Sequence, residues 1–277
     1  MNKSHLTIEN RIKLRVFFLM FLAFLLTNCT EKIDTDLNSS SPQIVVEGNI
    51  SIDEPAIIKL TESVNFDENN IFPKGEGALI RISDNTGNTE ILTETEPGTY
   101  KSYILTGKIG YTYSISFETD NKILTSNSTI PNQINFDSLI VKKSSLSGGF
   151  GNPGATNSYE VIVKYSDPID ENNYYRFVEI VNGEFSNDHV FDDRLINGLE
   201  VENTLKSFKR ELSQGDTLKI IMQCIDKNVY EYFNSFSNLS GGPMNSSTPA
   251  NPYTNIEGGI LGYFSAHTSQ EHECIIQ

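Results

Sequence analysis

Between residues 43 and 131 the chain alternates apolar and polar side chains over short runs, the pattern of β-strands that bury one face. In the clearest run, residues 111–118, an aromatic residue or Ile occupies every second position and polar residues occupy the others. Residues 84–88 (DNTGN) separate two such runs and predict a tight hairpin. The predicted strands are residues 43–52, 56–61, 78–83, 90–93, 99–104, 111–118 and 122–129. Seven short strands in about ninety residues are typical of an immunoglobulin-like β-sandwich, which we expect over residues 42–131.

The second segment, residues 132–277, continues the strand pattern and adds one helix. Residues 134–141, 159–165, 174–181 and 217–225 are predicted as strands, and the Gly/Ser-rich residues 144–157 as a loop. Residues 227–239 carry apolar side chains at offsets of three and four, namely Val229, Tyr232, Phe233 and Phe236. This spacing predicts a helix with Asp226 as its N-cap, Gly241-Gly242-Pro243 after its end, and an aromatic face that packs against a sheet. We therefore expect a mainly β protein, in which an N-terminal immunoglobulin-like sandwich is followed by a β-rich domain with one short helix.

The first 28 residues have the order of charge and hydrophobicity of a signal peptide. Four basic residues precede an unbroken apolar run from residue 16 to residue 26. Eleven residues make the core of a signal peptide but cannot cross a bilayer of about 30 Å at about 1.5 Å per helical residue. The segment 1–28 is therefore predicted to be a leader that is removed on export.

The leader ends in the tetrapeptide Leu26-Thr27-Asn28-Cys29, which has the form of a lipobox. A lipoprotein signal peptidase cleaves before such a Cys, whose thiolate receives a diacylglycerol through a thioether and whose freed amine is then acylated, for example with palmitate. Asn28 departs from the Gly, Ala or Ser usual at that position. We predict that Cys29 is the lipidated N-terminus and binds the lipid bilayer through its acyl chains, because two or three chains anchor a protein stably. An ordinary secretory signal with an incidental Cys is the alternative.

Residues 29–41 are polar and show no apolar periodicity. We expect a flexible tether there. Its acidic residues, Glu31, Asp34 and Asp36, resemble a signal that exports some lipoproteins to the cell surface, and a solvated linker explains them equally well. The protein would then lie on either the periplasmic or the cell-surface face of its membrane.

Composition narrows the class of protein. The chain has 277 residues, with 21 Lys and Arg against 36 Asp and Glu, a net charge of −15. This charge argues against nucleic acid as a partner, because such binding relies on clustered basic residues. Sixteen Phe and twelve Tyr rule out a chain that is disordered throughout, and the one long apolar run rules out a multi-span membrane protein. Without the leader the count becomes 17 basic against 35 acidic residues, so anionic lipid surfaces would repel the body and the acyl chains would have to hold it.

Two groups of residues in the C-terminal part of the chain could form a metal site or a disulfide. Residues 267–274 contain metal-ligand types at spacings that match no known zinc site. His267, His272 and Cys274 are therefore weak metal candidates, with a frayed acidic tail as the alternative, and no cofactor is expected. Cys224 and Cys274 are the thiols that remain after lipidation, and an oxidising compartment would allow a disulfide that closes 49 intervening residues. Because Cys224 lies in an apolar run, a buried free thiol is the equal alternative.

The sequence contains no recognisable catalytic motif. There is no G-x-S-x-G nucleophile elbow and no phosphate-binding loop, so we expect no catalytic residue and no enzyme activity. The acidic groups Asp67/Glu68 and Asp188/Asp192/Asp193 could hold calcium in a loop but match no EF-hand, and solvated surface explains them better. Paired carboxylates that cleave glycosides depend on a separation set by the fold, so a hydrolase stays an alternative.

Several short motifs together resemble one protein family. They are Val45-Val46-Glu47-Gly48, Asp167-Pro168, residues 173–176 (NYYR), Phe191-Asp192-Asp193, Asn197-Gly198, Gly215-Asp216-Thr217, residues 230–233 (YEYF), Asn251-Pro252 and residues 254–264 (TNIEGGILGYF). In this order and spacing the chain resembles the lipoprotein family called domain of unknown function 4249, over nearly all of the mature chain. The resemblance implies an outer-membrane lipoprotein of Bacteroidota-type bacteria, often encoded beside a TonB-dependent receptor, and it brings no activity or catalytic residue. Within the motifs, Gly262 and the pair Gly258-Gly259 are expected to permit close backbone approach, and Asn197-Gly198 to form a turn.

We therefore expect a non-enzymatic accessory lipoprotein, anchored in the outer membrane, that binds a TonB-dependent β-barrel receptor or a nutrient such as a glycan or a peptide. A hydrolase that acts on a polysaccharide or a peptide outside the cell is the second hypothesis. A structural or adhesion protein of the envelope is the third.

Overall fold

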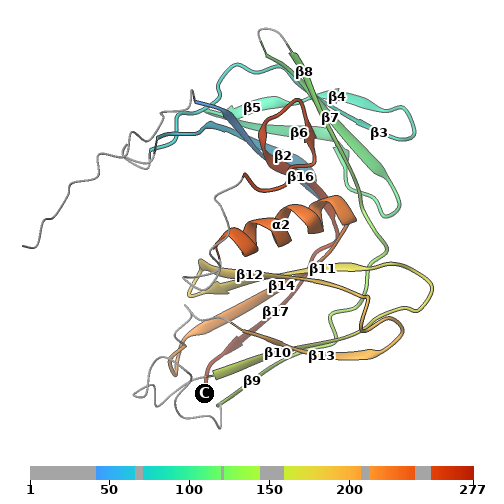
Figure 1. Ribbon diagram of the computed structural model, residues 1–277, viewed down its shortest axis with the longest axis vertical. Coiled ribbons are helices and arrows are strands. Elements are labelled where there is room, and N and C mark those ends of the chain that lie inside the picture. The colour runs from blue at the N-terminus through green and yellow to red at the C-terminus, as the bar shows by residue number, and fades with distance from the viewer. Residues whose placement is uncertain (1–41, 66–70, 120–121, 144–158, 207–211, 241–250) are drawn as a thin grey trace, which may run out of the picture. The chain divides into compact units, whose positions relative to one another are not determined.

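The computed structural model describes residues 42–65, 71–119, 122–143, 159–206, 212–240 and 251–277 of the protein (Figure 1). Strands make up most of these residues, and one helix, α2 (Lys227–Ser240), interrupts them. The expected mainly β class is thereby confirmed. The leader, Cys29, the tether 29–41, the loop 144–157 and Gly241-Gly242-Pro243 lie outside the described residues.

The strands follow one another closely along the chain. Their bounds are β1 Ile44–Ser51, β2 Pro55–Glu62, β3 Ile80–Asp84, β4 Thr89–Ile91, β5 Thr93–Glu96, β6 Thr99–Thr106, β7 Thr112–Thr119, β8 Lys122–Thr129, β9 Ser138–Lys143, β10 Tyr159–Ser166, β11 Tyr174–Val181, β12 Glu184–Asp192, β13 Glu200–Leu205, β14 Thr217–Ile225, β15 Ile256–Glu257, β16 Leu261–His267 and β17 Gln270–Ile275. Every strand expected from the alternating pattern has a counterpart here, within a few residues at each end. Strands β5, β12, β13, β15, β16 and β17 have no predicted counterpart.

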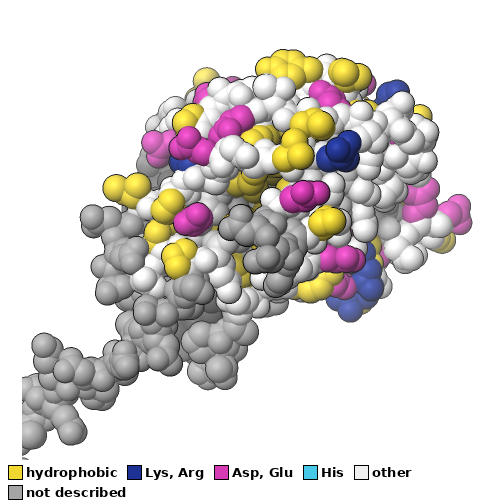
Figure 2. Space-filling view, turned by 90° about the horizontal axis from the view of Figure 1, so that it is seen from above, with side chains coloured by type: hydrophobic (Ala, Val, Ile, Leu, Met, Phe, Trp, Pro, Cys, Tyr) yellow, Lys and Arg dark blue, Asp and Glu magenta, His cyan; other side chains and the backbone are white. Residues whose placement is uncertain are grey.

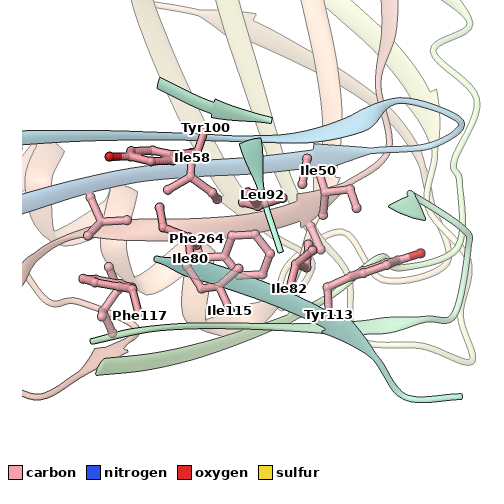
Figure 3. Packing of buried hydrophobic residues seen from close by; sticks show 14 of the residues in the cluster. Ile50, Ile58, Ile80, Ile82, Leu92, Tyr100, Tyr113, Ile115, Phe117 and Phe264 are labelled. Atoms are coloured by element: carbon pink, nitrogen blue, oxygen red, sulfur yellow. The ribbon is translucent and has the colours of Figure 1, made fainter. Parts of the chain in front are cut away.

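The first eight strands, together with the late strands β15 and β16, form two sheets that face each other over one apolar core. One sheet has the strand order β16-β1-β2-β6-β5 and the other β15-β8-β7-β3-β4. Along β7 the side chains of Tyr113, Ile115 and Phe117 are buried, and the residues between them face outward. Figure 3 shows these three side chains packed with others from the opposite sheet, among them Tyr100 and Phe264. The alternating pattern therefore predicted the buried face of this sandwich correctly.

The remaining strands form a second pair of sheets. Their orders are β13-β10-β9 and β12-β11-β14-β17, and Val163, Phe177 and Met222 lie in the core between them. Helix α2 covers the other face of the four-stranded sheet, where Val229 and Phe233 of the helix are buried (Figure 1). The aromatic face of the predicted helix therefore packs against a sheet, as expected.

Asp226 fixes the start of α2 and joins the helix to the first sandwich. Its Oδ1 accepts the backbone amide of Val229 at 2.9 Å, as an N-cap does. Its Oδ2 accepts the amide of Thr129 at 3.0 Å and the hydroxyl of Ser128, both at the end of β8. The Ser128 Oγ in turn accepts the amide of Ala266 at 2.8 Å. One carboxylate thus connects the helix with β8 and, through Ser128, with β16.

Strand β16, late in the chain, pairs in parallel with β1, the first described strand. The register runs from Val45 opposite Leu261 to Ser51 opposite His267. Phe264 of β16 is consequently buried in the first core. Two residues beyond β16 the chain enters β17, which pairs with β14 in the second half. The domain boundary expected near residue 131 is thus crossed by a late segment that belongs to both halves.

Two of the unpredicted strands owe their structure to their neighbours in the sheet. β12 and β17 consist mostly of polar and charged residues, so their sequences show no continuous apolar face. β12 forms because it pairs along its length with β11, and β17 forms because it pairs along its length with β14. Strand propensity in this protein therefore depends on the position of a segment in the sheet as well as on its own residues.

The close contact between β16 and β1 depends on Gly262. Its φ of +106° lies outside the range that L residues adopt readily. A Cβ built at this position would lie 1.9 Å from the carbonyl oxygen of Val46. The expectation of a close backbone approach at this glycine is confirmed.

We predict that Gly262→Ala lowers the free energy of unfolding by more than about 3 kcal/mol, because the new methyl would collide with the backbone of β1 and add φ strain. Gly259→Ala is the matched control, since its φ is +79° and no atom lies within 4 Å of the built Cβ. The control should cost only about 1–2 kcal/mol. Urea denaturation of both variants measures the difference, and equal stabilities would contradict the proposed collision.

Candidate functional site

A polar hollow opens beside the segment that leads from β8 to β9. Its volume is about 360 Å³, and it is a shallow hollow that is more open than enclosed. It is lined by Gln133, Ile134, Asn135, Asp137, Ser166, Asp167 and Pro168. Most of these side chains carry an amide, a carboxylate or a hydroxyl, so the hollow can form hydrogen bonds with a polar ligand.

Asp167, which directly follows β10, is a lining residue of the hollow and forms hydrogen bonds that hold its surroundings in place. Its buried carboxylate accepts a hydrogen bond from the Tyr175 hydroxyl and another, at 3.2 Å, from the amide of Gly198. The amide of Asp167 donates to the carbonyl of Leu199 at 2.9 Å. Burial, together with the hydrogen bond to Asp167, raises the pKa of Tyr175, so its hydroxyl stays protonated and donates. These bonds join β10 and β11 to the turn at residues 194–198, where the predicted Asn197-Gly198 turn lies.

Asp193, just before the same turn, is a second buried carboxylate. It accepts the amide of Asn173 at 2.6 Å, and its own amide donates to the carbonyl of Asn173 at 3.2 Å. Two residues before Asn173, the carboxylate of Glu171 accepts the side-chain amide of Asn132 at 2.6 Å, next to the residues that line the hollow. The loop 167–173 is therefore held between the turn and the segment that leads to β9.

Three large aliphatic side chains project from these two loops into solvent. Ile169, Leu195 and Leu199, which we call the apolar rim, are 69%, 92% and 54% exposed. Ile169 packs against Gly198, whose amide binds Asp167 in the wall of the hollow, so the rim lies beside the hollow. The exposed acidic residues next to the rim are Asp170, Glu171 and Glu200. Exposed large apolar side chains on adjoining loops are a feature of surfaces that bind another molecule.

A largely buried chain of polar groups runs beneath α2. The guanidinium of Arg176 donates to Asp188 Oδ2 from Nε at 3.0 Å and lies 2.9 Å from the same oxygen at Nη2. It also lies 3.7 Å from the centre of the Phe233 ring, in a cation–π contact. Its Nη1 donates to Gln223 Oε1 at 3.3 Å, and Gln223 Nε2 lies 3.0 Å from Nε2 of His267. The chain joins β11, β12, β14 and β16, and its contacts are internal to the protein.

His267 lies at the end of this polar chain. It is buried, and its Nδ1 lies 2.9 Å from the Ser265 hydroxyl while its Nε2 meets Gln223. Burial, and then the positive charge of Arg176, lower the pKa of His267 to about 4. The imidazole is therefore neutral at ordinary pH, with both ring nitrogens engaged inside the protein.

The other residues of the suggested metal cluster lie on β17, which is a regular strand and not a frayed tail. Because side chains alternate along a strand, His272 and Cys274 face the core, and the glutamates beside them face outward near Lys219. Nε2 of His272 lies 2.8 Å from the carbonyl oxygen of Phe136. Within the described part of the chain, no three His, Cys, Asp or Glu side chains are grouped so that they could hold a metal ion.

Cys224 and Cys274 are both free thiols. In the ladder between β14 and β17, Cys274 lies opposite Leu218, which is six residues or about 20 Å along the strand from Cys224. A disulfide requires Cα atoms within about 7 Å of each other, so the geometry does not bring these thiols together. Burial raises the pKa of the Cys224 thiol and favours its neutral form. The alternative of a buried free thiol therefore describes Cys224.

The acidic residues considered for calcium have separate partners. Asp192 accepts hydrogen bonds from Arg194 at 2.7 Å and from the Tyr230 hydroxyl at 2.9 Å. Asp188 and Asp193 have the partners described above, so the three carboxylates are engaged in contacts within the protein. Asp67 and Glu68 lie outside the described residues.

The sequence did not indicate the structural role of several polar residues of this region; Asp193 was considered only as a calcium ligand or a solvated surface acid, and Asp167 and Tyr175 were given no role. Asp167, Tyr175 and Asp193 lie in the motifs that carry the family resemblance, but a sequence does not show which backbone amides a carboxylate will meet. A second pair that the sequence did not indicate joins the buried Glu179 to the partly buried His189, whose Nε2 lies 3.0 Å from Oε1 of Glu179. Its signal was present, because Glu179 follows two aromatic residues at the inward positions of β11.

One family model matches nearly the whole chain. The model described as Domain of unknown function (DUF4249) matches residues 30–273, which include both pairs of sheets, the hollow and the apolar rim. No curated protein matches the chain. Among the residues that the structure describes, no helix combines the length and the apolar character needed to cross a bilayer.

We predict that the free energy of unfolding decreases as the pH falls from about 6.5 to about 4, because the unfolded chain binds a proton at His267 in this range and the folded protein does not. The stability that the folded protein gains by keeping His267 neutral is complete above this pH range and is lost below it. Denaturant titrations across the range measure the slope. His267→Gln, which keeps hydrogen-bonding groups but cannot titrate, should flatten it, and an unchanged slope in that variant would contradict the assignment.

Proposed function

The chain belongs to the family of domain of unknown function 4249, and we propose that it is a non-enzymatic accessory lipoprotein of the outer membrane. In this proposal Cys29 carries the acyl chains that bind the bilayer. The folded part binds a TonB-dependent receptor, or the glycan or peptide that such a receptor takes up.

The observation that carries the binding role is the polar hollow with the apolar rim beside it. Amide, carboxylate and hydroxyl groups of the hollow can orient a polar ligand, and the rim can bury apolar surface of a ligand or a receptor. Asp167 and Asp193 hold the loops of this surface through buried hydrogen bonds. Such preorganisation lowers the entropic cost of binding, which supports a recognition role.

The membrane anchor is supported by the N-terminal sequence. Basic residues, an apolar core of eleven residues and the lipobox that ends at Cys29 follow one another in the order that lipidation requires. The acidic body has no electrostatic attraction to anionic lipids, so an acyl anchor is the interaction that would hold it at the membrane. The outer membrane of Bacteroidota-type bacteria is the location that the family resemblance favours.

We predict that Cys29→Ser moves the protein from the membrane fraction to the soluble fraction, because Ser cannot form the thioether with diacylglycerol. Cys274→Ser is the matched control and should stay in the membrane fraction. Fractionation with immunoblotting measures the change, and mass spectrometry of the wild-type N-terminal peptide should show the added acyl mass. Unchanged fractionation of Cys29→Ser would contradict the anchor.

We predict that Ile169→Asp combined with Leu195→Asp weakens binding of the receptor or nutrient at least about tenfold, because charges replace the apolar surface that the partner would bury. Ile275→Asp is the control, since Ile275 is an aliphatic residue on β17 with nearly the exposure of Ile169. Affinity purification from detergent-solubilised membranes, with the β-barrel receptor quantified by mass spectrometry, and glycan and peptide arrays measure the effect. Full binding by the rim variant would contradict the site, and turnover of a polysaccharide or peptide would favour the hydrolase instead.

A further inference from the structure

Three consecutive apolar residues, Ile71, Phe72 and Pro73, are exposed on the first sandwich. We call them the entry patch. Ile71 is 78% exposed and Phe72 is 48% exposed. Consecutive exposed apolar residues are unfavourable in water and are typical of a surface that something else covers.

The entry patch lies beside the point at which the chain enters its first strand. The amide of Glu62 donates to the carbonyl of Pro73 at 2.9 Å, and the amide of the next residue, Ser63, donates to the carbonyl of Gln43 at 2.8 Å. The end of β2 therefore runs between the patch and Gln43. With neighbouring strands about 4.8 Å apart, the patch and the chain entry are about 10 Å from each other.

The length of chain before the first strand limits how far this end can lie from the anchor. Twelve residues lie between Cys29 and Pro42, so the two are thirteen residue steps apart. Even a fully extended segment of that length spans at most about 45 Å, so acyl chains on Cys29 would keep the entry patch near the bilayer. Contacts that are too weak to bind a membrane alone become effective at the high local concentration that such an anchor gives.

Charge does not draw the folded part onto lipid, so the contact has to be apolar. Figure 2 shows hydrophobic side chains interspersed with acidic ones on one face of the protein, and only a few Lys or Arg. The net charge of −15 is unfavourable beside an anionic lipid surface. Aliphatic and aromatic side chains, in contrast, gain free energy when they enter the boundary between headgroups and acyl chains.

We propose that the entry patch rests in the headgroup region of the bilayer that holds Cys29 and so gives the folded part a fixed orientation on the membrane. This inference rests on the proposed lipid anchor and adds the surface that faces the lipid. The occupant of the patch is a lipid surface, and the open end of the β1–β2 hairpin, where Gln43 and Ser63 lie, is turned toward it.

The absence of Trp from the chain allows a direct test, because one introduced Trp reports only on its own position. Phe72→Trp places this probe in the entry patch. Tyr103→Trp is the matched control, since Tyr103 is 66% exposed on β6 of the same sheet. Tyr103 lies on β6 opposite the start of β2, near Pro55 and Ile57. The entry patch lies at the other end of β2, beside Glu62, about 20 Å away along the sheet.

Both variants are produced as full acylated chains and reconstituted into phosphatidylcholine–phosphatidylethanolamine vesicles, with acyl chains either unlabelled or brominated near the headgroup. We expect the emission of Phe72→Trp to shift to the blue and to be quenched by the brominated lipid. The emission of Tyr103→Trp should stay unshifted and unquenched. Circular dichroism and co-sedimentation of the same samples show whether each variant is folded and bound to the vesicles.

Quenching of Phe72→Trp alone supports the contact between the entry patch and lipid. Co-sedimentation without quenching of Phe72→Trp overturns it and leaves the anchor standing, whereas failure to co-sediment overturns both. Equal quenching of the two variants also overturns it, because the contact would not be specific to the patch. Self-association that is lost in Phe72→Asp would assign the patch to a second copy of the chain and likewise overturn it.

Discussion

The parallel pairing of β16 with β1 is the interaction on which both halves of the fold depend. Through it Phe264 completes the first core, and the same segment continues into β17 at the edge of the second half. The fit is close because two glycines remove the side chains that would separate the strands. A Cβ at Gly48 would lie 2.8 Å from Phe264, and one at Gly262 would lie 1.9 Å from the Val46 carbonyl. Half of the other pairings join strands that are consecutive in sequence, whereas this ladder joins the first described strand to one more than 200 residues later.

Local structure in this chain can be predicted from its residues, whereas the long-range pairing cannot. Alternation is a local property, and it was enough to place β7. Helical spacing and a capping carboxylate were likewise enough to place α2 and Asp226. β16 differs, because its neighbour in the sheet lies about 200 residues away and a parallel partner leaves no mark in the nearby sequence. β17 contains glutamates at its outward positions, which gave it the composition of a solvated tail.

The candidate site was less predictable than the fold, because loops create it. Aspartates are usually surface residues, yet Asp167 and Asp193 are buried, and backbone amides of other segments, together with the Tyr175 hydroxyl, donate to their carboxylates. Which amides these are depends on the closed fold, so no spacing in the sequence encodes the hollow. A lipobox is the opposite case, because an enzyme recognises it as a linear segment and its form can be found by inspection.

The late position of β16 also affects how the protein is made. Until residue 267 has been synthesised, the first sandwich lacks Phe264 from its core, and the backbone groups of β1 have no partner on that side. The partly made chain therefore closes its first sandwich late, because this long-range pairing has to wait for the last strands. A product that stops short of β16 leaves an open sheet edge, which proteases and aggregation both exploit. Chains that contain β16 are therefore expected to resist proteolysis and aggregation better than chains that end before it.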